Sequence, residues 1–228
     1  QITGSISPFG LSSVSQSLWY MEHISVGSSI VLEYTGSGIS SGSYNGSIKD
    51  PYYQYGTIKF YPVASDLTQV ASVYLPIFNG DWWSVMVVSG SKSSQGNTGY
   101  KLVAGNKIYN GNDGTSIGYY SSSIVDTTDS NSWTVNPGGV LEHSSYFASG
   151  SLYPKFSGSM QEVRYYNTQL SESVFKDYIM NPLSSEGNNT NTSPDDLVFR
   201  AALGSELDLN YQYSPTIFKD VSIHPKIT

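Results

Sequence analysis

Cysteine is absent from the 228 residues, so a disulfide framework, a thiolate metal site and a cysteine nucleophile are all excluded. Charge is scarce as well: 13% of the residues are charged, and 11 Lys and Arg against 18 Asp and Glu give a net charge of -7. Because phosphate contacts need clustered Lys and Arg, we expect no nucleic-acid partner. No apolar run approaches the roughly 20 residues that span a bilayer, so we expect no membrane insertion.

The abundant residues are those that favour strands and turns: 19 Tyr and 22 Gly, together with many Ser and Asn. Short β-branched and aromatic runs recur between Gly, Ser, Asn and Asp clusters, which is the spacing of an all-β sandwich. The length suits one such domain. We predict strands at about 18–24, 29–34, 56–61, 71–77, 82–89, 101–104, 116–120, 140–142 and 159–166.

The run from Trp82 to Val88 is apolar on both of its alternating faces, with Val85 and Val87 on one and Met86 on the other. A strand with two apolar faces is covered on both sides. We therefore predict that this strand lies in the centre of a sheet.

A single helix is predicted at 172–180, because Ser171 can cap its first turn and Asn181-Pro182 stops it. A polar linker follows. We divide the chain into a main module at 1–183, a linker at 184–195, and a strand-forming tail at 196–228 that completes the same sandwich or begins a further repeat. The sequence opens at Gln1 without an initiator Met, so we expect a fragment or processed product of a larger, multi-module or oligomeric assembly.

The residue patterns of hydrolases are missing. No Glu-x-Asp-x-x-Glu pair of catalytic carboxylates occurs, and the isolated glutamates Glu22, Glu142 and Glu162 suit solvated or ion-paired roles better than acid catalysis. His23, His143 and His224 are too scattered to form a zinc motif. No Gly-x-Ser-x-Gly elbow stands between a strand and a helix. We therefore predict that the chain is not an enzyme and requires no cofactor.

Two stretches resemble the laminin G-like, or concanavalin A-like, lectin family. From Phe156 to Ser171 a Gly enters a strand, an acidic-apolar-Arg centre and an aromatic follow, and Leu-Ser opens a short helix. From Leu75 to Trp83 a loop precedes a strand that carries tryptophan. The resemblance implies an antiparallel jelly-roll β-sandwich with one short helix near the C-terminal end of the main module.

Family members often hold calcium at a loop rim, which makes Asp81, Asn110, Asn112 and Asp113 candidate ligands, although turn formation alone also explains these residues. Aromatic residues in segments that resemble loops offer rings for stacking on sugars. Alternatively, they stabilise strand ends by packing the ring and hydrogen-bonding the hydroxyl. These candidates are Tyr44, Tyr52, Tyr53, Tyr55, Tyr119 and Tyr120.

Two functions of different classes follow from these patterns. The first is a non-catalytic module that recognises carbohydrate, or mediates adhesion, in an extracellular, cell-surface or virion setting. The second is a structural module, such as a phage capsid or tail decoration or an adhesin spacer, whose partners are neighbouring protein subunits. A glycosidase comes a distant third, because the carboxylate pair is missing.

Overall fold

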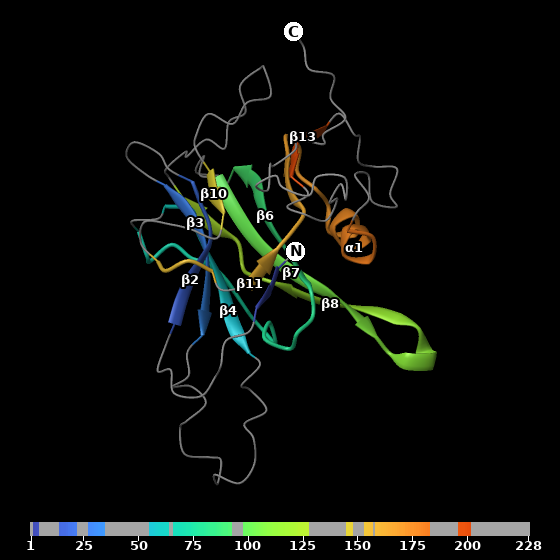
Figure 1. Cartoon of the computed structure of the whole chain (residues 1–228). Coiled ribbons are helices and arrows are strands. Elements are labelled where there is room, and N and C mark those ends of the chain that lie inside the picture. Colours follow the sequence, from blue (N-terminus) through green and yellow to red (C-terminus); the bar gives the residue numbers. More distant parts are fainter. Residues whose placement is uncertain are drawn as a thin grey trace, which may run out of the picture.

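The computed structural model describes residues 2–4, 14–21, 27–34, 55–63, 66–92, 98–127, 145–147, 153–156, 158–182 and 196–201. Within these ranges the chain is mostly antiparallel β-sheet, with one α-helix, α1 (Glu172–Met180) (Figure 1). This confirms the predicted dominance of strands and the single helix for the ranges described. The sequence periodicity explains the result, since the apolar runs alternate with a period of two.

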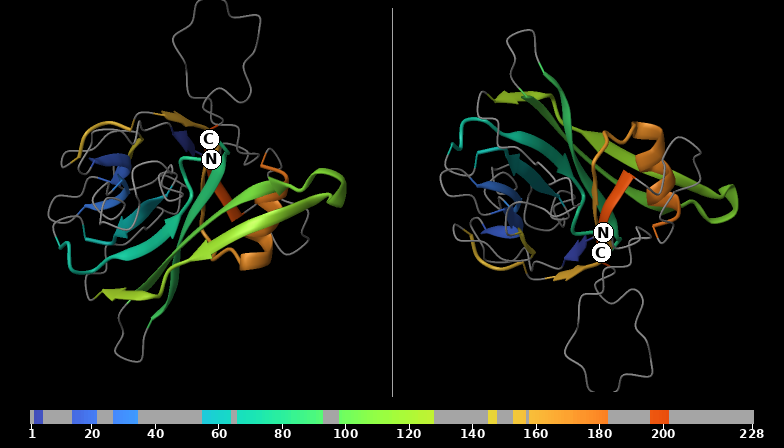
Figure 2. Two further views of the ribbon diagram at one scale, coloured as in Figure 1. Left: turned by 90° about the horizontal axis from the view of Figure 1, so that it is seen from below. Right: turned by 90° about the horizontal axis from the view of Figure 1, so that it is seen from above.

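The largest sheet has six strands in the order β11–β1–β6–β7–β8, with β9 also paired to β7. Its strands are β1 (Ile2–Gly4), β6 (Trp83–Lys92), β7 (Thr98–Tyr109), β8 (Thr115–Ser121), β9 (Val125–Thr127) and β11 (Gly158–Met160). Strand β6 lies in the middle of this order, as its two apolar faces predict. Strands β7 and β8 form a long hairpin that reaches out beyond the other strands (Figures 1 and 2).

The second sheet has five strands in the order β10–β2–β3–β4–β5. They are β2 (Val14–Met21), β3 (Ser28–Tyr34), β4 (Gly56–Tyr61), β5 (Ala71–Leu75) and β10 (Ser145–Phe147). Strand β5 buries alternate residues and exposes Ser72 and Tyr74, which is the pattern of an edge strand with one wet face.

The two larger sheets share one apolar core. Phe60 of β4 and Tyr100 of β7 bring their ring centroids within 5.4 Å of each other, so side chains of both sheets meet there. Burial of this apolar surface is the main favourable term in folding. The completely buried members of the core are Leu32, Ile58, Phe60, Leu75, Ile77, Leu102 and Ala104.

Helix α1 covers the opposite face of the six-stranded sheet. Phe175 and Ile179 pack there with Val103 of β7, and Met86 of β6 lies against the same cluster. The Ser171 side chain accepts a bond from the Val174 N–H at 3.4 Å, so the predicted cap and helix bounds are confirmed. Strand β6 is therefore covered on both faces.

A third sheet joins β12 (Val163–Tyr166) to β13 (Leu197–Ala201). The predicted strand at 159–166 is divided, because Glu162 has a φ of 56° and separates β11 of the six-stranded sheet from β12. The Trp19 indole N–H donates to the Tyr165 hydroxyl at 2.7 Å, which ties β12 to the five-stranded sheet.

Strand β13 belongs to the predicted tail, and its partner β12 belongs to the predicted main module. The predicted strand at 140–142 and the residues after 201 lie outside the described ranges. The proposed boundaries at 183 and 195 also fall outside them, so the division into module, linker and tail stays a prediction.

Candidate functional site

A partly exposed aromatic pair on the sheet surface is formed by Tyr55, which precedes β4, and Tyr74 of β5. Thr57 stands opposite Tyr74, so Tyr55, two residues before Thr57, shares its face. The ring centroids lie 5.0 Å apart with a tilt of 32°. Tyr74 is 53% exposed, and Tyr55 is half-buried. The pair therefore presents aromatic surface to solvent from neighbouring strands.

The backbone beneath this pair is held by close packing. Gly56 follows Tyr55, and a Cβ at that position would lie 2.8 Å from the Phe78 ring and 3.1 Å from a methyl carbon of Ile77. Phe78 in turn meets Tyr34 edge to face at 5.7 Å. The tyrosine pair thus stands on a strand that has little freedom to shift, which suits a preorganised binding surface.

Tyr119 and Tyr120 lie in strand β8, in agreement with the strand predicted at 116–120. They therefore project from opposite faces of the sheet. The Tyr120 ring is 5.7 Å from Trp83 and packs against the core. Burial, and then the influence of Tyr55, raise the pKa of Tyr120.

Tyr119 is held by helix α1. Its ring meets Phe175 at 6.5 Å, and the Lys176 ammonium lies 4.6 Å from the ring centroid. Burial raises the pKa of Tyr119, and the neighbouring Glu172 carboxylate adds to the rise. These contacts favour a packing role for Tyr119. The remaining tyrosine candidates, Tyr44, Tyr52 and Tyr53, lie outside the described residues.

The first calcium candidate, Asp81, belongs to the turn between β5 and β6. Its carboxylate accepts bonds from the side-chain amides of Asn79 at 2.7 Å and Asn106 at 3.1 Å. The Asn79 carbonyl oxygen accepts from the Asp81 backbone N–H at 3.0 Å and from the Trp83 indole at 3.2 Å. Gly80 supplies a φ of 86°. These bonds give Asp81 a turn-forming role.

The other three calcium candidates stand at the tip of the β7–β8 hairpin. Asn110, whose amide donates to the Ser116 hydroxyl at 2.9 Å, precedes a 3-10 turn at Gly111–Asp113 that contains Asn112 and Asp113. Since Asn110 is four residues beyond Asn106 along β7, the tip stands about 13 Å from the Asp81 contact. The four candidates therefore form two separate groups. In the described ranges, no three His, Cys, Asp or Glu residues gather as a metal site would require.

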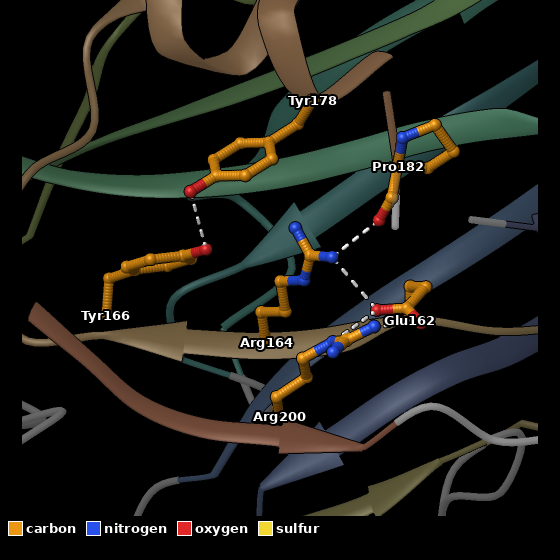
Figure 3. A network of polar contacts seen from close by, with 6 residues as sticks. All are labelled: Glu162, Arg164, Tyr166, Tyr178, Pro182 and Arg200. Atoms are coloured by element: carbon orange, nitrogen blue, oxygen red, sulfur yellow. Dashed lines mark hydrogen bonds and ion pairs between the residues drawn. The ribbon is translucent and has the colours of Figure 1, made fainter. Parts of the chain in front are cut away.

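A buried ionic cluster joins β12 to β13 (Figure 3). The Arg200 guanidinium donates two bonds of 2.9 Å to the Glu162 carboxylate, and Arg164 donates a third at 3.0 Å. The Glu162 side chain is only 3% exposed. Arg164 also donates to the Pro182 carbonyl and lies 4.9 Å from the Tyr178 ring, whose hydroxyl accepts from Tyr166.

Among the described residues, this ionic cluster holds one carboxylate, that of Glu162, and two guanidinium groups bind it. The predicted ion-paired role of Glu162 is confirmed. The partner Arg200 was not identified from the sequence, since it is 38 positions away. Glu22, Glu142 and the three histidines lie outside the described residues.

Tyr74 was also missed as a site residue, although a signal for it exists. Alternation over the predicted strand at 71–77 places Ala71, Val73 and Leu75 on one face and leaves Tyr74 on the other. Two aromatic residues can then meet across neighbouring strands. What the sequence alone lacks is the register that pairs β4 with β5.

In the part of the chain that the structure describes, α1 is the only α-helix, and no helix has the length and apolar character needed to cross a membrane. Comparisons with protein-family models, curated proteins and solved structures gave no match to this chain.

Proposed function

We propose that this chain is a non-catalytic module that recognises carbohydrate through the Tyr55–Tyr74 pair. The observation that supports this proposal is the pair itself: two rings side by side on one sheet face, one of them more than half exposed. Exposed aromatic rings present flat apolar surface with a hydroxyl at the rim, and lose little conformational entropy on binding.

The fold that we propose around this surface is the antiparallel jelly-roll β-sandwich of the laminin G-like and concanavalin A-like lectins. The shared core of the two larger sheets supports a sandwich. The pairing of β13 with β12 supports a tail that completes the same domain. We place the module on a cell surface, in an extracellular assembly or on a virus particle.

The alternative proposal is a structural module whose partners are neighbouring protein subunits. It draws support from Tyr119 and Tyr120, which pack against α1 and the core. In that case Tyr74 contacts another protein and no sugar binds.

The experiment is a glycan array on the whole chain, run with and without calcium, followed by Tyr74→Ala. We expect Tyr74→Ala to weaken binding about tenfold at an unchanged melting temperature, which is the loss of one stacking contact. Tyr109→Ala is the matched control, because Tyr109 is 76% exposed at the hairpin tip, away from the pair. If no glycan is retained, or if Tyr74→Ala binds like the parent chain, the carbohydrate proposal is wrong.

A further inference from the structure

The described ranges contain two Asn-Gly pairs, Asn79-Gly80 and Asn110-Gly111, and the structure holds them differently. Asn79 lies in the turn before β6, and it is half-buried. Asn110 lies at the tip of the projecting β7–β8 hairpin (Figure 1), where both Asn110 and Gly111 are exposed. Because the two pairs have the same residues, a difference in their reactivity would come from the fold.

An Asn-Gly pair can lose its side-chain amide without an enzyme, because glycine has no side chain to keep its backbone nitrogen away from the asparagine. The glycine nitrogen attacks the side-chain carbonyl carbon of asparagine, and the new C–N bond closes a five-membered imide. The amide nitrogen leaves as ammonia and takes the proton of the glycine N–H. Water then opens the imide at either carbonyl, which gives aspartate or isoaspartate. The net change is a hydrolysis, with nothing oxidised or reduced.

The attack requires the asparagine side chain to turn toward the next backbone nitrogen, and three hydrogen bonds oppose that movement at Asn79. Its amide donates to the Asp81 carboxylate at 2.7 Å. Its carbonyl oxygen accepts from the Asp81 N–H at 3.0 Å and from the Trp83 indole N–H at 3.2 Å. Trp83 is only 1% exposed, so this last partner is fixed in the core. Asn79 can therefore react only when the turn opens.

Among the described residues, one partner holds the Asn110 side chain: its amide donates to the Ser116 hydroxyl at 2.9 Å. The Asp113 N–H donates to the Asn110 carbonyl at 3.2 Å, and every residue from 110 to 116 is exposed. Exposed turns without buried contacts open at the lowest cost in free energy. We propose that Asn110 is a site of spontaneous deamidation, and that the folded structure protects Asn79 from the same reaction.

The reaction changes the hairpin tip in two ways. Either product replaces a neutral amide with a carboxylic acid, so the tip gains a second carboxyl group beside that of Asp113. Isoaspartate also lengthens the backbone by one carbon, which disturbs the geometry in which the Asn110 N–H donates to the Gly114 carbonyl at 2.9 Å. The surface around the exposed Tyr109 therefore differs between newly made and aged protein.

The experiment incubates the full chain in mildly alkaline buffer and follows both asparagines in one digest by mass spectrometry, in which deamidation adds about 1 Da. We expect the peptide that contains Asn110 to convert, while the peptide that contains Asn79 stays intact in the folded chain. The same chain unfolded in urea is the matched control, because both pairs should then convert at similar rates.

Two variants test the parts played by single groups. Ser116→Ala removes the acceptor of the Asn110 amide and should speed conversion about fivefold, the effect of one ordinary hydrogen bond. Gly111→Ala places a methyl group beside the attacking nitrogen and should slow conversion in folded and unfolded chains alike.

The proposal is overturned if Asn110 stays intact in the folded chain, or if Asn79 converts there as fast as Asn110. It is also overturned if the same difference between the two asparagines persists in urea, or if Ser116→Ala leaves the rate at Asn110 unchanged. Sugar binding plays no part in these outcomes, so they are independent of the proposed function.

Discussion

The apolar core and the ionic cluster stabilise the same chain by different physics. The core between the two larger sheets consists of aliphatic and aromatic side chains, whose burial is favourable in any orientation. The ionic cluster of Glu162, Arg164 and Arg200 depends on direction, because three buried charged groups must keep their bonds. The apolar core should therefore lose stability in proportion to the side-chain volume removed, whereas the ionic cluster should be disrupted by the loss of one charged group.

The largest expected effect is that of Glu162→Gln, which leaves two buried guanidinium groups without their carboxylate. We expect the free energy of unfolding to fall by about 4 kcal/mol, the usual cost of breaking a buried ion pair from one side. Urea unfolding followed by tryptophan fluorescence measures it. A loss below about 1 kcal/mol would show that the ionic cluster contributes no more than a surface pair.

A double-mutant cycle with Arg200→Gln serves as the control for this substitution. Because both variants break the same bidentate contact, the combined loss should be smaller than the sum of the single losses. Additive losses would mean that the two side chains act independently, contrary to the observed bonds.

In the apolar core, Leu102→Ala tests how much stability is lost when side-chain volume is removed. Leu102 is completely buried, so we expect a loss of about 3 kcal/mol from lost burial and the resulting cavity. The loss should be insensitive to salt, since no charge is involved. Ile108→Ala on the same strand, where the side chain is partly exposed at 38%, should cost much less. Equal losses for the two would contradict the core assignment.

The smallest effect is expected at the helix cap. Ser171→Ala removes the hydroxyl that accepts from the Val174 N–H, and should lower the free energy of unfolding by about 1 kcal/mol. Thermal unfolding of Ser171→Ala and Ser171→Asp distinguishes the cap from a general effect of substitution. The aspartate variant should keep most of the stability, because its carboxylate can accept the same bond.

Sequence patterns over neighbouring residues predicted the bounds of individual helices and strands. The helix at 172–180 and the strand at 56–61 have their predicted bounds. Helix capping and the alternation of a strand depend only on residues that are close in sequence. The break at Glu162 was not predicted, since a positive φ at a glutamate has no signature in residue type. The strand predicted at 116–120, which contains Tyr119 and Tyr120, lies within β8.

The candidate site was only half predicted, for a physical reason. Tyr55 was identified from its sequence context, whereas Tyr74 and Arg200 take their roles from partners that are distant in sequence. Strand register and strand pairing arise from packing over the whole sheet, so one sequence does not fix them. The three tyrosine candidates at 44, 52 and 53 remain predictions.

The link between Glu162 and Arg200 also sets an order of events during translation. The ribosome makes Glu162 well before Arg200, so a nascent chain that has reached the helix still lacks the bidentate partner and strand β13. Until residue 201 has emerged, β12 lacks its partner β13, and the Glu162 carboxylate beside β12 lacks Arg200. A product that terminates early therefore carries an unfinished strand edge of the kind that quality-control proteases and chaperones recognise.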